Sequence, residues 1–232
     1  MNKYKRVLIK LSGEALAGDK GYGYDYDFLN DITKELVTLH QSGVQIALVV
    51  GGGNFWRGRQ GGEMDRTTAD QMGMLATVIN GLALQDAIEQ KGVKTSLQSS
   101  IAIEKVCETF TRRKAIEHFE KGEILIFAGG TGSPYFSTDT AAALRAAEIG
   151  ADVILLAKNV DGIYDSDPKI NKNAKKYDKI SYIDFIKNGL KAMDVTAVTM
   201  CMENNMPILC FGLEKGALLN AVNGKSTGTL IK

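Results

Sequence analysis

The sequence has few cysteine, proline and histidine residues, almost no net charge and no long apolar run. Its 28 Lys and Arg residues are balanced by 27 Asp and Glu residues, so it lacks the basic surplus typical of nucleic-acid-binding proteins. No apolar run approaches the ~18 residues of a membrane span, and the run Val7–Leu11 is too short for a signal peptide. We therefore expect neither a nucleic acid nor a membrane as partner, and no leader or anchor.

The three cysteines and two histidines limit the chemistry that this chain can perform. Cys107, Cys201 and Cys210 are odd in number, widely spaced and outside any CxxC pattern, so we expect free thiols and a cytoplasmic location. No residue group has the spacing of a zinc site, and we predict no metal ion held by the protein alone. His40 and His118 lie in helix-like stretches of mixed polarity, so both are poor candidates for a catalytic residue.

Short apolar runs bounded by turn residues recur along the chain. They are continuously apolar, which is typical of strands buried on both faces of a parallel sheet. Patterns with helical spacing lie between them, and no repeat or linker divides the chain. We predict an α/β fold, a three-layer αβα sandwich around a largely parallel sheet, as one domain over residues 1–232. The predicted strands are Val7–Leu11, Val44–Val50, Ile124–Ala128, Val153–Ala157, Ile208–Phe211 and, more weakly, Thr229–Ile231.

The predicted helices differ in how much of their surface is apolar. The longest, Thr67–Gln90, is apolar over more than one stripe, so we expect it to be central in the fold or to form part of a subunit contact. The other predicted helices run from about Phe28 to Gly43 after a cap at Asp25 or Asp27, from Thr140 to Ile149, and near Tyr182–Lys187, Asp194–Asn204 and Lys215–Ala221.

Glycine is abundant, at 25 of 232 residues against roughly 7% in average proteins. The carboxyl ends of parallel strands meet at one edge of a sheet, where loops lead into helix N-termini and ligands bind. Glycine lets backbone N–H groups approach an anion there. Nine glycines follow predicted strands in this way, which indicates a phosphate site: Gly13, Gly51, Gly52, Gly53, Gly129, Gly130, Gly132, Gly162 and Gly212.

Charged residues at the same edge suggest phosphoryl transfer. Lys10 lies inside an otherwise apolar strand, where an ammonium group needs an anionic partner or an escape to solvent. Arg57 and Arg59 lie in the glycine-rich stretch 51–62 and could reach a phosphoryl group. Acidic side chains at Asp70, Asp139, Asp161, Asp165 and Asp167 could orient the lysine or a magnesium shell, although each also fits an ordinary role as helix cap, turn former or solvated charge.

Several motifs together resemble the bacterial uridylate (UMP) kinases of the amino acid kinase superfamily. The resemblance runs in order and spacing from about Tyr4 to Lys232, and the stretches 70–77 and 131–139 are specific to the UMP kinase branch. The motifs are Lys10-Leu11-Ser12-Gly13-Glu14, Gly51-Gly52-Gly53-Asn54, Trp56-Arg57-Gly58, Asp70-Gln71-Met72-Gly73-Met74, Gly130-Thr131-Gly132-Ser133-Pro134, Val160-Asp161-Gly162 and Met193-Asp194.

The resemblance implies transfer of the ATP γ-phosphoryl group to UMP with Mg²⁺, in pyrimidine nucleotide biosynthesis. It also implies a homo-oligomer, as a rule a hexamer, with GTP as a possible activator and UTP as a possible inhibitor. A nucleotide-sensing protein without activity, or a small-molecule kinase of another branch, such as a carbamate kinase, would be the alternatives on the same fold.

The family's functional positions fall on matching residues of this sequence. The resemblance implies catalytic roles for Lys10, Arg57, Asp139 and Asp194. For ATP it implies Lys10, Leu11, Ser12, Gly13, Gly53, Arg57, Asn159, Tyr164 and Asp167. For UMP it implies Gly52, Asp70, Thr131, Gly132, Ser133, Pro134, Tyr135, Phe136, Ser137 and Thr138. The segment linked to GTP activation corresponds to Gly18, Asp19, Lys20, Gly21, Tyr22 and Gly23.

Two positions depart from the family pattern. Ser133 stands where the family usually has asparagine, so one hydroxyl replaces an amide donor and acceptor near the expected uracil site. The segment 157–160 varies in length among relatives, and either Lys158 or Asn159 could face the nucleotide. Neither departure removes the residues expected to bind phosphate.

Overall fold

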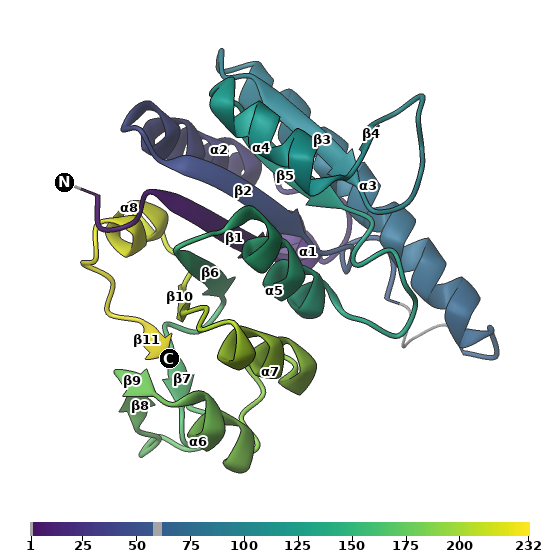
Figure 1. The fold of residues 1–232 in the computed structure, drawn as a ribbon. Coiled ribbons are helices and arrows are strands. Elements are labelled where there is room, and N and C mark those ends of the chain that lie inside the picture. Colours follow the sequence, from purple (N-terminus) through teal and green to yellow (C-terminus); the bar gives the residue numbers. More distant parts are fainter. Residues whose placement is uncertain (1, 58–61) are drawn as a thin grey trace.

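The computed structural model describes residues 2–57 and 62–232, which form an α/β fold around a nine-stranded sheet (Figure 1). The strand order is β4-β3-β5-β2-β1-β6-β10-β11-β9, and β7 and β8 pair separately. The strands are β1 (Arg6–Leu11), β2 (Gln45–Val50), β3 (Thr95–Ser99), β4 (Glu108–Thr109), β5 (Ile124–Ala128), β6 (Val153–Lys158), β7 (Ile163–Tyr164), β8 (Lys176–Tyr177), β9 (Lys179–Ile180), β10 (Ile208–Gly212) and β11 (Thr229–Ile231).

Helices cover both faces of this sheet, as predicted. The helices are α1 (Gly13–Ala17), α2 (Tyr26–Gln41), α3 (Arg66–Glu89), α4 (Arg112–Glu120), α5 (Thr138–Ile149), α6 (Tyr182–Lys187), α7 (Val195–Glu203) and α8 (Ala217–Val222), with a 3₁₀ turn η1 (Gly18–Lys20) after α1. Alternate strand residues pack into two hydrophobic cores, so that Val7 and Ile9 lie under α2, α3 and α8 while Leu8 faces α4, α5 and α7. This is the three-layer arrangement expected from the sequence.

The pairing in the centre of the sheet is parallel. β1 pairs in parallel with β2 and β6, β2 with β5, and β6 with β10, whereas β10 and β11 are antiparallel. The carboxyl ends of the five central strands therefore lie at one edge, and the segments that follow β1, β2 and β5 carry the glycines at positions 13, 51–53, 129, 130 and 132.

Local sequence signals explain where the helices begin and end. Asp25 caps α2 by accepting from the N–H groups of residues 27 and 28, and Thr111 caps α4 in the same manner. Gly150 ends α5 in the left-handed conformation, at φ 64°. The sequence patterns did not indicate β3, β4, α1, α4 or the short strands β7–β9.

The long helix α3 combines a buried face with an exposed apolar stripe. Val78 and Leu84 lie in the core, while Leu75, Ile79 and Leu82 are 49%, 48% and 39% exposed. Their spacing of four and three residues places them along one side of the helix. Over the described residues, none of the helices combines the length and apolar character that a bilayer crossing requires.

Candidate functional site

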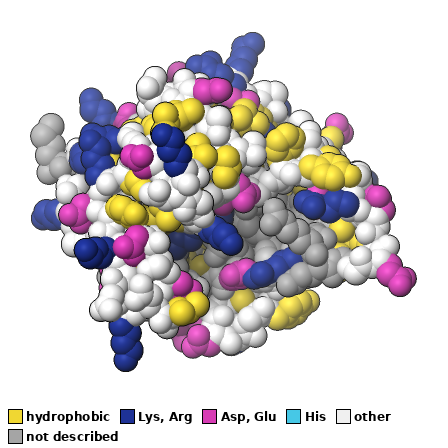
Figure 2. Space-filling view, turned by 90° about the horizontal axis from the view of Figure 1, so that it is seen from below, with side chains coloured by type: hydrophobic (Ala, Val, Ile, Leu, Met, Phe, Trp, Pro, Cys, Tyr) yellow, Lys and Arg dark blue, Asp and Glu magenta, His cyan; other side chains and the backbone are white. Residues whose placement is uncertain are grey.

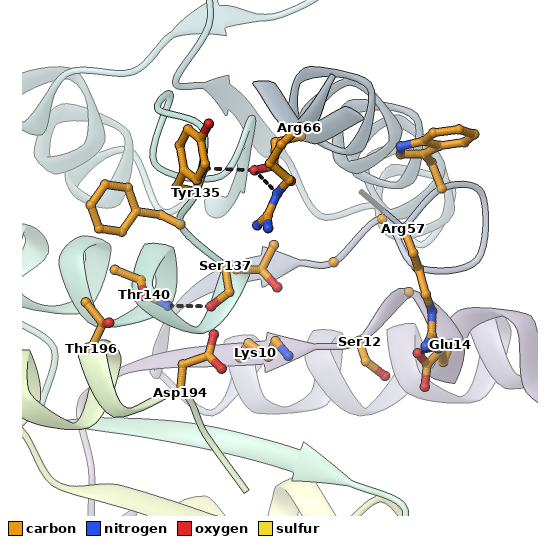
Figure 3. A pocket seen from close by; sticks show the side chains of 18 of the residues that line it. Lys10, Ser12, Glu14, Arg57, Arg66, Tyr135, Ser137, Thr140, Asp194 and Thr196 are labelled. Carbon is orange, nitrogen blue, oxygen red and sulfur yellow. Dashed lines mark hydrogen bonds and ion pairs between the residues drawn. The ribbon is translucent and has the colours of Figure 1, made fainter. Parts of the chain in front are cut away.

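The loops after β1, β2 and β5 border a cavity of about 620 Å³, here called the main cavity (Figure 3). The N-termini of α3 and α7 complete its walls. Many of the residues expected from the sequence line it: Lys10, Ser12, Gly13, Gly52, Gly53, Arg57, Asp70, Tyr135, Phe136, Ser137, Thr138 and Asp194. On the molecular surface, basic and acidic side chains lie close together around the hollow in the face shown in Figure 2.

Lys10 lines the main cavity and forms an ion pair with Asp139, which itself does not line the cavity. The Lys10 Nζ atom lies 2.8 Å from Asp139 Oδ1, and the two side chains are only 8% and 13% exposed. Burial alone would raise the pKa of the Asp139 carboxyl, but the Lys10 and Lys158 ammonium groups outweigh burial and hold that pKa below its usual range. Ser137 is the N-cap residue of α5, so the Asp139 carboxylate is not needed as a helix cap and pairs with Lys10.

Lys158 is a second ammonium group close to this pair. It is the last residue of β6, next to β1 in the sheet. Burial lowers its pKa and the nearby Lys10 lowers it further, whereas the carboxylates of Asp139 and Asp194 act in the opposite direction. Two lysines and two carboxylates therefore balance one another in charge at the carboxyl ends of β1 and β6.

Helix N-termini point their N–H groups toward the main cavity from three sides. Ser12 caps α1 by accepting from the Ala15 N–H at 3.1 Å, and Ser137 caps α5 by accepting from the N–H groups of residues 139 and 140. Asp194 is the N-cap residue of α7, and its side chain makes no capping hydrogen bond. These dipoles favour negative charge in the cavity, as the glycine pattern predicted.

Arg57 and Glu14 form an ion pair on the outer side of the main cavity. Their side chains are 45% and 51% exposed, and a Cβ atom on Gly53 would lie between them, 3.5 Å from Glu14 and 3.6 Å from Arg57. Because both side chains are about half exposed, the Arg57 guanidinium has room to turn toward an anion that takes the place of Glu14. Arg59, the other arginine of this stretch, lies outside the described residues.

Asp70 connects α3 to the loop that follows β5. Its Oδ2 atom accepts from Arg66 Nε and from the Tyr135 backbone N–H, both at 2.8 Å, and the Arg66 guanidinium lies over the Tyr135 ring (Figure 3). Tyr135 has φ 70°, a strained value for a residue with a side chain. A small cavity of about 140 Å³ lies behind this contact and is lined by Asp70, Gly130 and Phe136 among others.

Four residues expected at the UMP site do not line these cavities: Thr131, Gly132, Ser133 and Pro134. The Thr131 hydroxyl instead bonds within its own turn, donating to the Ser133 carbonyl and accepting from the Ser133 N–H. Leu11, expected near ATP, has its side chain fully buried in the core, so only its backbone could reach a ligand.

A second cavity of about 620 Å³ opens on the other side of β1. It is lined by the remaining residues that the resemblance assigns to ATP, Asn159, Tyr164 and Asp167, and also by Lys158, so both alternatives for that position face it. Ser12 and Glu14 line both large cavities, which places the two side by side at the start of α1. The Tyr164 hydroxyl donates to Asp161, at 2.7 Å.

The segment Gly18–Gly23 lies beside the glycine loop after β2, outside the cavities described above. The Gly23 N–H donates to the Asn54 carbonyl at 3.3 Å, and Asn54 Nδ2 donates to the Gly23 carbonyl at 2.8 Å. Tyr22 is 69% exposed and packs edge-on against Phe55. The segment is thus attached to the glycine loop through Asn54.

Three residues near the site were not predicted as functional. Glu14 and Arg66 line the main cavity, and no pattern in the sequence distinguishes them from neighbouring charged residues. Asn80 is fully buried in α3; its Nδ2 donates to the Gly51 carbonyl and to Asn54 Oδ1, both at 2.7 Å, and its Oδ1 accepts from Asn54 Nδ2. An asparagine inside an apolar helix stretch was the available signal.

Comparison with known proteins shows the family to which this chain belongs. Residues 5–212 match the model of the amino acid kinase family. Among solved structures, the UMP kinase from Bacillus anthracis is similar with a TM-score of 0.95 and 39% identity, over 99% of this chain and 96% of that chain. The UMP kinase from Ureaplasma parvum gives 0.94 and 39% over 99% of both chains. The uridylate kinase from Archaeoglobus fulgidus gives 0.76 and 25% over the whole of both chains.

Proposed function

Because the chain belongs to the amino acid kinase family, we propose that it transfers the γ-phosphoryl group of ATP to UMP, giving ADP and UDP. The observation that carries the proposal is that Lys10, buried and paired with Asp139, lines a cavity bordered by several helix N-termini. A buried lysine held by one carboxylate is suited to neutralising charge on a phosphoryl group in transfer.

The two adjoining cavities suit the two nucleotides. In the proposal, the second cavity takes the nucleoside of ATP beside Asn159 and Tyr164, and the phosphates extend past Ser12 toward Lys10. Arg57 and the backbone N–H groups of Gly13 and Gly53 bind the same phosphates.

UMP lies on the α3 side of the main cavity in this arrangement. Asp70 has acceptor oxygens for the ribose hydroxyls, Gly52 allows close approach of the phosphate, and the small cavity beside Gly130 and Phe136 has room for a pyrimidine base. In the proposal, loop residues 135–138, which line the main cavity, contact the base and the phosphate.

The residues present also fit Mg²⁺ brought in with the nucleotide. Mg²⁺ is usually held by one or two carboxylates together with substrate phosphates and water. Asp194 offers such a carboxylate in the main cavity near Lys10 (Figure 3), while no group of three or more His, Cys, Asp or Glu side chains suited to a metal occurs among the described residues. When bound, the ion would add positive charge at the phosphate oxygens.

The proposed reaction needs no covalent nucleophile on the protein. An oxygen of the UMP phosphate attacks the γ-phosphorus, the bond from the γ-phosphorus to its bridging oxygen breaks, and ADP leaves with the electron pair. Lys10 neutralises charge on the transferring group, Asp139 keeps the ammonium in place, and Arg57 neutralises the phosphates from the outer side. The protein therefore acts by positioning and charge stabilisation.

A coupled assay of ADP formation tests the proposal, with UMP, CMP, dUMP, acetylglutamate, aspartate and carbamate as acceptors. We expect turnover with UMP, and Lys10→Met should lower kcat by orders of magnitude while calorimetry still detects UMP binding. Lys34→Met, at an exposed lysine, is the control and should leave kcat unchanged. Binding of UMP without ADP formation would instead favour a nucleotide-sensing protein, and turnover with another acceptor would favour another branch of the family.

The proposal extends to assembly and regulation. The exposed apolar stripe of α3, formed by Leu75, Ile79 and Leu82, is suited to contact with a second copy of the chain, which supports a homo-oligomer. A hexamer, activation by GTP through the segment Gly18–Gly23 and inhibition by UTP stay predictions, as do a single domain over residues 1–232 and a cytoplasmic location. Analytical ultracentrifugation tests the assembly, and a monomer at micromolar concentration would contradict it.

A further inference from the structure

Arg145 is a buried arginine outside the cavities of the proposed site. It lies on α5, and its side chain is only 6% exposed. Its guanidinium lies 3.7 Å from the centre of the Phe110 ring and pairs with Glu148. Among the described residues, its Nε atom has no hydrogen-bond partner. A buried charge with an unpartnered donor costs free energy, so its position calls for an explanation beyond packing.

The guanidinium reaches the loop after β5 through one serine. Arg145 Nη2 donates to the Ser100 hydroxyl at 3.0 Å, and Ser100 Oγ lies 2.8 Å from the Gly130 carbonyl oxygen. Arginine can only donate, so the hydroxyl accepts from Arg145 and its proton points to the carbonyl. The Ala128 carbonyl, at 3.4 Å, is the other acceptor within reach of this hydroxyl, and the shorter distance favours Gly130, so the two hydrogen bonds of the relay polarise each other.

Gly130 lies where the loop begins to surround the small cavity. Its neighbour Gly129 donates its N–H to Thr77 Oγ1 at 2.7 Å, so α3 holds the loop from one side while Ser100 holds it from the other. A Cβ atom on Gly132 would lie 3.0 Å from the Ser100 carbonyl, which shows how closely the two segments approach. Movement of Ser100 would therefore move the loop.

We propose that Arg145 is a positioning residue for the acceptor nucleotide: through Ser100 it fixes the Gly130 carbonyl, and with it the loop that binds the base. This inference rests on the proposed function. Arg145 touches neither substrate, so its loss should weaken UMP binding and leave the ATP side and the transfer step largely intact. The hydrogen bond from the Gly129 N–H to Thr77 remains when Arg145 is replaced, so the loop should become more mobile but stay attached to α3.

Steady-state kinetics with Ser100→Ala and Arg145→Met test this role. Losing one hydrogen bond in the relay should raise the KM for UMP about three- to tenfold, with kcat and the KM for ATP within about twofold of wild type. The double variant should raise the KM for UMP no further than Arg145→Met alone, because both changes break the same relay. Ser96→Ala, at a buried serine of β3, is the matched control and should leave every constant unchanged.

Three results would overturn the inference: an unchanged KM for UMP in Ser100→Ala, an equal rise in the KM for ATP, or the same rise in Ser96→Ala. If Arg145→Met does not fold, Ser100→Ala alone decides the question, because it removes only one hydroxyl. Failure of the proposed function is distinguishable, since wild type would then form no ADP with UMP. Titration calorimetry of UMP with each variant gives the same comparison without turnover.

Discussion

The substitution Asp139→Asn tests whether the Lys10–Asp139 pair stabilises the fold as well as the proposed chemistry. It keeps the shape of the side chain and removes its charge, so Lys10 loses the carboxylate 2.8 Å away while Lys158 stays nearby. Removing one partner of a buried ion pair typically costs about 3–5 kcal/mol, because the other charge stays buried without compensation. For a chain of this length that corresponds to a fall in Tm of roughly 10 °C.

The pH dependence follows from the lowered pKa of Asp139. The unfolded carboxyl has its ordinary pKa of 3.8, and the pKa of the folded carboxyl lies below that value. Between these two pKa values the folded state therefore binds fewer protons than the unfolded state. The contribution of the Lys10–Asp139 pair to the free energy of unfolding is therefore complete above about pH 4. It is lost as the pH falls through the pKa of the folded carboxyl. The difference between wild type and Asp139→Asn should be fully developed at pH 5 and shrink toward pH 3.

Urea unfolding at several pH values, followed by circular dichroism, measures both effects. Asp31→Asn is the matched control, because it breaks an exposed pair with Lys34 at 3.5 Å and should change the free energy of unfolding by less than about 0.5 kcal/mol. An Asp139→Asn protein as stable as this control at pH 7 would refute the reasoning. A difference that grew on acidification would also refute it, since the sign of the pKa shift would then be wrong.

Four further changes test other contacts. Asn80→Leu leaves two buried hydrogen-bonding groups unpartnered and should lower the free energy of unfolding by about 2–5 kcal/mol in urea, and a loss below 0.5 kcal/mol would contradict this. Gly52→Ala would place a Cβ atom 2.8 Å from the α3 backbone and should raise the KM for UMP; an unchanged KM would show that the loop can give way. Ile79→Lys should reduce the sedimenting mass without lowering stability, and an unchanged mass would exclude the α3 stripe as the contact. Ser133→Asn, which introduces the family's usual amide, should lower the KM for UMP if this side chain reaches the base, and an equal KM would show that it does not.

The central strands could be predicted because both of their faces are covered. A strand between two helix layers must be apolar throughout, and β1, β2, β5, β6 and β10 are almost entirely buried. The helical patterns between the strands predicted that the strands run parallel. Parallel strands in turn predicted that the glycine loops meet at one edge of the sheet. These features depend on local sequence and on general rules of chain connection.

The missed elements have a different physical basis. β3 has the sequence TSLQS, yet four of its five residues are buried, and a polar partner receives part of this buried polarity: Gln98 Nε2 donates to Glu108 on β4, at 2.9 Å. Such a strand does not look apolar in the sequence. In α4, Ala115 and Phe119 are the fully buried residues, and one pair spaced by four residues is too little to reveal a helix.

At the site, the sequence predicted positions better than partners. Lys10, near the carboxyl end of β1, and Asp139, at the start of the helix after β5, had to lie at the same edge, because β1 and β5 run parallel and are close in the sheet. Which carboxylate pairs with which cation depends on side-chain direction and burial. The partners of Arg57 and Asp70, namely Glu14 and Arg66, could not be predicted for this reason.

Arg145 shows why a buried positioning residue escapes sequence analysis. Arg145 and Glu148 are three residues apart on a helix, while Arg113 and Glu117 are four apart, and both patterns are typical of solvated ion pairs. Arg113 is 90% exposed as that pattern predicts, yet Arg145 is 6% exposed because Phe110, from a segment 35 residues earlier, covers it. Local spacing therefore cannot separate an inert surface pair from a buried one. The difference arises only when distant segments pack together, and the proposed relay to the nucleotide loop depends on that packing.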